Sequence, residues 1–246
     1  MLRVLQIFCI FDSIAVICTS CLGWPDAQPP PQELVRTFDE RKLNAIGVAI
    51  HEARLEKHLP GGVLWLERQG VAFHRAYGMA STQPVSAVAQ GNTIYDAASL
   101  TKVVATTPAV LLLHERRKLN IKDPVRKHLP EFTGQGRESI TIRQLLTHTS
   151  GLRPDISVNG WTGHQECIAK CVVEVPRAAP DERFIYSDIN FQLLDEIVRR
   201  VSGKRLDVFC TEEIFEPLKM YDTGYNPPVT KQTRIAPTTV TDGKGL

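Results

Sequence analysis

The pattern of apolar and polar residues predicts a largely helical chain. In its second half, apolar residues recur three and four positions apart and stop before Gly203, at Ile189, Leu193, Leu194, Ile197, Val198 and Val201. This stripe predicts an amphipathic helix that packs on a core. Related patterns predict helices over 43–58, which Pro60-Gly61-Gly62 ends, over 141–146 and over 206–215.

Two short apolar segments near residue 70 predict a β-hairpin. Residues 63–68 and 71–77 are rich in apolar and aromatic side chains, and a turn that contains Gly70 separates them. Residues 118–130 are polar, and we expect them to form a loop. The order of elements is therefore a helix, a hairpin and a long helical stretch, which indicates an α+β fold.

The clearest candidate chemistry lies in Ser99-Leu100-Thr101-Lys102, which precedes the uncharged residues 103–113. We expect one buried helix here, with Asp96 as its N-cap and with either a lost backbone hydrogen bond or a kink at Pro108. Positions i and i+3 share a helix face, so Lys102 should reach the Ser99 hydroxyl. Burial should lower the pKa of Lys102, as a general base requires, while free N–H groups at the helix start stabilise an oxyanion. The predicted chemistry is acyl transfer through an acyl-serine.

A second candidate group is Tyr186, in the sequence Tyr186-Ser187-Asp188 just before the amphipathic helix. A nearby cation makes a phenol proton easier to remove. Beside Lys102, this phenol could take the serine proton and return it to a leaving group. Taken singly, each motif also has a packing interpretation: a buried helix whose lysine reaches solvent, and a tyrosine at a helix entrance capped by Asp188.

Together with the run Leu-Leu-Thr-His-Thr-Ser-Gly-Leu over 145–152, these motifs resemble the serine β-lactamase-related family. That family includes class C β-lactamases, low-molecular-weight penicillin-binding proteins and esterases. The run over 145–152 is the most specific match, and segments 214–220 and 234–238 add weaker support. The resemblance implies a β-lactamase/transpeptidase-like α+β fold, in which helices flank an antiparallel sheet and a second, mostly helical subdomain is present.

The resemblance also implies roles for single residues. Ser99 becomes the acylated nucleophile, Lys102 its proton partner and Tyr186 the second acid/base group, while Asp188 and Asn190 become substrate-binding residues. The position two after the tyrosine is usually Asn in the family and is Asp188 here. Its negative charge should raise the pKa of Lys102 and favour the tyrosine as base. His148, within the run over 145–152, is expected to be structural.

One family motif has no match. After Tyr186 the sequence shows neither Lys-Thr-Gly nor His-x-Gly on a strand; Asp-Thr-Gly at 222–224 and Gly-Lys-Gly at 243–245 do not fit. We therefore expect a truncated domain without the C-terminal strands of the sheet. Two functions stay open: a serine hydrolase acting on an ester, a D-Ala-D-Ala-type peptide or a β-lactam, and an inactive remnant or non-enzymatic binding domain of the same family.

The composition limits the classes of binding partner that we expect. The 246 residues are 43% hydrophobic and carry a formal net charge of +2, without a basic run interleaved with aromatic residues, so nucleic acid is not an expected partner. The resemblance instead implies a small-molecule or peptidoglycan-type substrate and no cofactor. His164, Cys167 and Cys171 share one helical face, but three ligands without a second cluster favour packing, and no metal is expected.

The start of the chain has a separate character. After Met1-Leu2-Arg3, an apolar run over 4–18 leads into the Pro-rich segment 25–31. We divide the chain into residues 1–27, a signal peptide or N-terminal anchor with the start of the linker, a linker over 28–37, and the β-lactamase-related domain over 38–246. Export to the periplasm or medium is expected, with membrane association through the N-terminal segment as an alternative.

Overall fold

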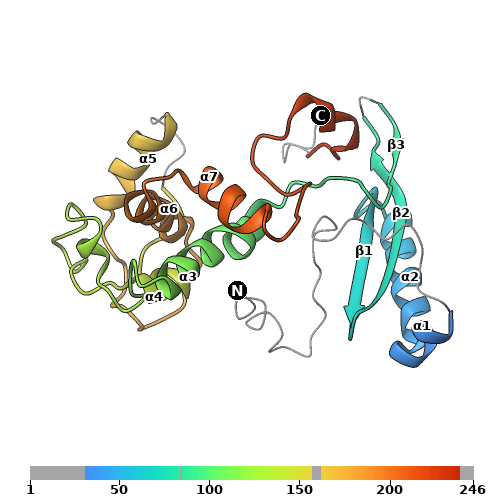
Figure 1. Ribbon diagram of the computed structural model, residues 1–246, viewed down its shortest axis with the longest axis horizontal. Helices are drawn as coiled ribbons and strands as arrows, with labels where there is room; N and C mark the ends of the chain where they lie inside the picture. Colours follow the sequence, from blue (N-terminus) through green and yellow to red (C-terminus); the bar gives the residue numbers. More distant parts are fainter. Residues whose placement is uncertain (1–30, 84, 157–161, 239–246) are drawn as a thin grey trace. The chain divides into compact units, whose positions relative to one another are not determined.

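The computed structural model describes residues 31–83, 85–156 and 162–238, which form parts of two compact units. The first unit combines residues 1–98 with 215–246, and the second is residues 99–214. Figure 1 labels five elements of the first unit: α1 (Pro31–Thr37), α2 (Glu40–Leu55), β1 (Gly61–Arg68), β2 (Val71–Ser81) and β3 (Ala87–Val88). The same unit contains the 3₁₀-helix η6 (Val229–Arg234) late in the chain.

The predicted hairpin is confirmed. β1 and β2 pair antiparallel from Gly61 opposite Gly78 to Arg68 opposite Val71. Gln69 and Gly70 both have positive φ, at 53° and 78°, the backbone of a tight hairpin turn whose twist suits the strands. β2 is longer than predicted because its end also pairs with β3, giving the sheet order β1-β2-β3. β3 has two residues, too few to show an alternating pattern.

The helices α1 and α2 both contact β2. α2 begins three residues earlier than predicted because Asp39 caps it: its Oδ1 accepts hydrogen bonds from the backbone N–H groups of Arg41 and Lys42, at 2.9 and 3.3 Å. The linker expected over 28–37 differs from the structure, which has α1 over Pro31–Thr37. A proline at the first helical position loses no hydrogen bond, so a Pro-rich segment can begin a helix.

The late part of the chain returns to the first unit. Ile94 and Ile235 form a parallel bridge: the Ile94 N–H donates to the Arg234 carbonyl, and the Ala236 N–H donates to the Ile94 carbonyl, both at 2.8 Å. The Arg234 side chain donates to the Asn92 carbonyl at 2.9 and 3.0 Å and pairs with Asp222. This attachment was not predicted from the sequence.

The second unit is helical. Its α-helices are α3 (Thr107–Glu115), α4 (Ile142–Leu146), α5 (Gly163–Val172), α6 (Asp188–Ser202) and α7 (Leu206–Cys210), and the π-helical turn η5 (Thr211–Phe215) continues α7. α6 contacts α3, α4, α5 and α7. The predicted apolar stripe on α6 is confirmed, since Ile189, Leu193, Leu194 and Ile197 are completely buried. The helix ends at Gly203, whose φ is 74°.

The predicted polar loop over 118–130 contains one short 3₁₀-helix, η4 (Val125–Lys127). In the described ranges, no helix is both long and apolar enough to cross a membrane. The proposed signal peptide or anchor over 1–27 lies outside them.

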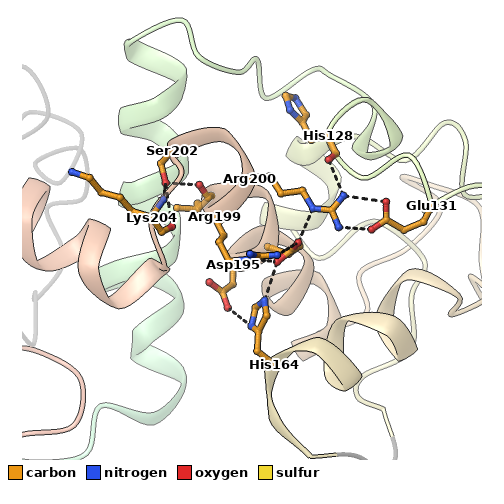
Figure 2. A network of polar contacts seen from close by, with 10 residues as sticks. His128, Glu131, His164, Asp195, Arg199, Arg200, Ser202 and Lys204 are labelled. Carbon is orange, nitrogen blue, oxygen red and sulfur yellow. Dashed lines mark hydrogen bonds and ion pairs between the residues drawn. The ribbon is translucent and has the colours of Figure 1, made fainter.

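A network of polar contacts links α6 to its surroundings; Figure 2 labels Arg199 and Arg200 of α6 together with Glu131 and His164. Glu196 is 1% exposed, and it accepts hydrogen bonds from Arg199 at 2.6 and 2.7 Å, from Arg200 at 2.6 Å and from His164 of α5 at 2.8 Å. Arg200 also pairs with Glu131 at 2.5 Å. Burial alone would raise the pKa of Glu196, but these hydrogen bonds outweigh it and lower the pKa to about 2.

We expect Glu196→Gln to lower the free energy of unfolding by about 3 kcal/mol, because Arg199, Arg200 and His164 lose the buried anion that accepts their hydrogen bonds. The pKa of Glu196 falls from 4.5 to about 2 on folding, so its contribution is complete above pH 4.5 and is lost as the pH falls towards 2. Urea denaturation at several pH values measures both effects.

Glu131→Gln is the matched control. It removes a half-exposed carboxylate from the same network and should cost less than about 1 kcal/mol. Equal losses for the two variants would contradict the assignment of Glu196 as the centre of the network.

Candidate active site

The segment around Ser99 departs from the single helix predicted there. The structure has a 3₁₀ turn, η2 (Ala98–Leu100), then a π-helical turn, η3 (Lys102–Thr106), and then α3. The Thr107 N–H donates to the carbonyl of Lys102, five residues back, and Pro108 lies at the start of α3, where its missing N–H costs nothing. The wider π turn therefore replaces the predicted kink, and π turns recur at functional sites.

Asp96 acts close to its predicted capping role. Its Oδ1 accepts a hydrogen bond from the Ala98 N–H at 2.8 Å. Ala98 itself has a φ of 42°, a left-handed conformation that costs a residue with a side chain about 1–2 kcal/mol. The chain thus enters the Ser99 segment through a strained residue that a side-chain hydrogen bond helps to hold.

Ser99 and Lys102 are brought together as their spacing predicts. The Lys102 Nζ donates to the Ser99 Oγ at 3.2 Å. Ser99 is exposed, while the Lys102 side chain is only 14% exposed. A hydroxyl open to a substrate therefore rests against a largely buried ammonium.

Tyr186 and Asp188 reach the same lysine from the segment before α6 and from its first residue. The Lys102 Nζ lies 2.5 Å from the Asp188 Oδ1 and 4.9 Å from the centre of the Tyr186 ring. Hydrogen bonds from Lys102 and Ser99 to the Tyr186 hydroxyl lower its pKa. Tyr186 is 44% exposed, so its phenol is accessible. The structure brings four predicted site residues into one cluster.

The pKa of Lys102 shifts in the direction opposite to the one expected from burial alone. Burial would lower the pKa of Lys102, as predicted from its helix, but hydrogen bonds and opposite charge from Asp188 and Tyr186 outweigh burial and raise it. Lys102 therefore holds its proton more tightly than burial alone would allow. The direction expected from the charge of Asp188 is the correct one, and the pKa that is lowered in this cluster is that of Tyr186.

His148 contacts the segment that carries Tyr186. Its Nδ1 accepts a hydrogen bond from the Ser187 N–H at 3.0 Å, and its ring lies 4.5 Å from the Tyr186 ring, centre to centre. Burial, and then the charge of Lys102, lower the pKa of His148 and keep the ring neutral. These contacts accord with the predicted structural role, because the ring positions the backbone and side chain that flank the site.

Asn190, expected to bind substrate, is completely buried. Its Oδ1 accepts a hydrogen bond from the Ser150 hydroxyl at 2.7 Å, and its amide nitrogen lies 3.4 Å from the His148 Nδ1. In this arrangement its amide faces the core and does not reach the Ser99 hydroxyl. Ser150 was not singled out as a functional residue, although it lies in the most specific sequence run, and it anchors the first turn of α6.

The residues considered as a metal site, His164, Cys167 and Cys171, have other surroundings in the structure. His164 pairs with Glu196, and Cys171 donates to Gln192 at 2.9 Å. Burial raises the thiol pKa of Cys167 and Cys171, which makes both unreactive. Across residues 31–83, 85–156 and 162–238, no three His, Cys, Asp or Glu side chains are placed to hold a metal ion.

The chain is similar in sequence to known proteins. A family model described as Beta-lactamase matches residues 32–245. Among curated proteins, the N-acetylmuramyl-L-alanine amidase of Bacillus subtilis (strain 168) is 29% identical over 211 residues, which are 77% of this chain and 48% of that protein. Protein flp of Staphylococcus aureus (strain COL) is 33% identical over 187 residues, 72% of this chain and 37% of that protein.

Solved structures show the same fold. A class C beta-lactamase superposes with a TM-score of 0.74 at 21% identity, covering 85% of this chain and 58% of that one. The octameric penicillin-binding protein homologue from Pyrococcus abyssi gives a TM-score of 0.67 at 25% identity, covering 85% and 50%. The predicted fold class is therefore confirmed, and the chain spans about half the length, or less, of the relatives it matches.

Gly151 in the run over 145–152 gives a test of how this loop is held. Its φ is 82°, and a Cβ there would lie 2.1 Å from the carbonyl oxygen of Ala178. We expect Gly151→Ala to lower the free energy of unfolding by more than about 2 kcal/mol, through backbone strain and this clash. Thermal or urea denaturation measures the loss.

Gly136→Ala serves as its control. Gly136 has a similar φ of 86° with open space around it, so this variant bears the backbone strain alone, about 1–2 kcal/mol. If both variants lost the same stability, the close approach of the loop to Ala178 would be refuted.

Proposed function

Since this chain belongs to the beta-lactamase family, we propose that it is a serine hydrolase that works through an acyl-enzyme at Ser99. One contact carries this proposal: the Lys102 Nζ lies 3.2 Å from the Ser99 Oγ, beside the accessible Tyr186 phenol. Nucleophile, cation and phenol lie within hydrogen-bonding reach of one another, as acyl transfer through an activated serine requires.

The charges assign the proton steps. Tyr186 in its phenolate form takes the Ser99 proton while Oγ attacks the carbonyl carbon of the substrate. The tetrahedral intermediate then collapses, the bond to the leaving group breaks, and Tyr186 returns the proton to that group. Water repeats the sequence at the acyl-serine and releases the acid. Lys102 stays protonated beside Asp188, where it favours the phenolate and holds the Ser99 hydroxyl.

The substrate classes proposed from the sequence are an ester, a D-Ala-D-Ala-type peptide or a β-lactam. The relatives named as an amidase and as class C beta-lactamases support acyl compounds of this kind. A peptidoglycan-type substrate would lie outside the cytoplasm. We therefore retain export, through residues 1–27, as part of the proposal.

Covalent labelling tests the nucleophile. A fluorescent fluorophosphonate should label the purified chain at Ser99, because this reagent needs a single attack by an activated serine. Ser99→Ala should abolish labelling, while Ser139→Ala, which removes another exposed serine, should leave it intact. Peptide mapping by mass spectrometry identifies the modified residue. Failure of the wild-type chain to react would refute the hydrolase and favour a non-enzymatic binding domain.

Tyr186→Phe tests the base. We expect kcat/KM for a reactive ester to fall by about 10²–10⁴, the usual contribution of a positioned general base. A base acts only when deprotonated, so wild-type kcat/KM should rise with pH through an ionisation below 10, the direction in which the pKa of Tyr186 is shifted. This rise of kcat/KM with pH should be absent in Tyr186→Phe. It should be unchanged in Tyr221→Phe, which alters an exposed tyrosine outside the site. A rising limb in Tyr186→Phe would rule out this role.

A further inference from the structure

We infer that Asp188 makes this site selective for acyl substrates that carry no carboxylate beside the scissile bond, with an uncharged ester as the preferred class. The inference rests on the proposed function and specifies its substrate. It also assigns Asp188 a role in specificity.

The first support is the state of the site's cation. A carboxylate-bearing substrate needs an unmatched positive charge near the nucleophile. The Lys102 Nζ lies 2.5 Å from the Asp188 Oδ1, and it also donates to the Ser99 Oγ at 3.2 Å. An ammonium whose charge is already matched at contact distance offers a second carboxylate little net attraction.

Two arginines near the Tyr186 segment, Arg153 and Arg143, are each paired with a carboxylate. Arg153, whose carbonyl accepts the Ser187 hydroxyl at 2.6 Å, is paired through its Nε with Glu174 at 2.6 Å. Arg143 is paired with Asp181 at 3.2 Å. The loops that hold the Tyr186 segment therefore add no unmatched positive charge from these two arginines.

The second support is the placement of Asp188 itself. Its backbone N–H donates to the Pro154 carbonyl at 2.6 Å, which fixes the residue at the first position of α6. Its side chain is 43% exposed, and its Oδ1, which pairs with Lys102, is buried. A substrate carboxylate that approaches Ser99 therefore meets an ion pair without net positive charge, and Asp188 is fixed where it keeps that pair formed.

Exposed apolar side chains lie next to Ser99 in the sequence and around the ring that supports Tyr186. Leu100 follows Ser99, Val103 follows Lys102, and both are about half exposed. Phe184 is exposed, and its ring lies edge-on to His148 at 5.7 Å, on the ring that supports Tyr186. These groups suit an uncharged, apolar acyl chain.

Two esters of equal size test the inference. The 3-carbamoylphenyl and 3-carboxyphenyl esters of hexanoic acid differ by one charge on the leaving group. The wild-type chain should show a kcat/KM at least about tenfold higher for the carbamoyl ester, since the carboxylate of the other ester loses hydration at the site and finds no unpaired cation there in return. Asp188→Asn should reduce this ratio by about tenfold or more. The ratio is the readout because the variant also changes the charge balance at Lys102, which affects both esters.

Two further variants separate charge at this position from charge elsewhere. Asp188→Glu keeps the carboxylate and should keep the wild-type ratio. Asp207→Asn, which removes a carboxylate paired with Arg205 on α7, should also leave it unchanged.

The outcomes are distinguishable. A wild-type chain that hydrolyses the carboxyl ester as fast as the carbamoyl ester, or faster, overturns the inference without reference to any variant. An Asp188→Asn ratio equal to that of the wild type overturns the role of this residue. In both cases fluorophosphonate labelling of Ser99 would persist and the proposed hydrolase would stand. Loss of labelling in the wild type would remove the hydrolase and this inference together.

Discussion

Burial of α6 is the constraint on which the second unit depends. Its apolar stripe packs against α3, α4, α5 and α7, so its position is fixed on several sides. The same helix carries Asp188 at its first residue and the buried Glu196 near its middle. The packing that stabilises the unit therefore also sets where the site's negative charge lies.

The site shows how a polar cluster changes the properties of its members. Lys102 alone, in an apolar helix, would lose its proton easily, while Tyr186 alone would hold its proton tightly. Placed together with Asp188, the lysine keeps its proton and the phenol gives its proton up more readily. Burial and the charge of Lys102 lower the pKa of His148, and its Nδ1 accepts a hydrogen bond from the backbone N–H of Ser187.

Features encoded by local pattern were predictable from the sequence. The hairpin, the stripe on α6 and the pairing of Ser99 with Lys102 follow from periods and spacings within a few residues. The direction of the Lys102 pKa required the position of Asp188, which lies far along the chain, and only the resemblance placed the two together. The burial of Asn190 and the attachment of Ile235 to Ile94 depend on contacts between residues far apart in the sequence, which a local pattern cannot predict. The π turn lies just before Pro108, which conflicts with a regular helix; this local signal was visible in the sequence, but it does not distinguish a π turn from a kink.

The bridge between Ile94 and Ile235 has a consequence for the order of folding. Its two strands belong to one unit but are separated along the chain by the whole of the other, so closing it requires a large loop. Residues 99–214 are contiguous and are synthesised before Ile235, so the helical unit has all its residues before this bridge can close. We therefore expect the helical unit to fold first during synthesis, and the bridge that joins Ile94 to Ile235 to form after it.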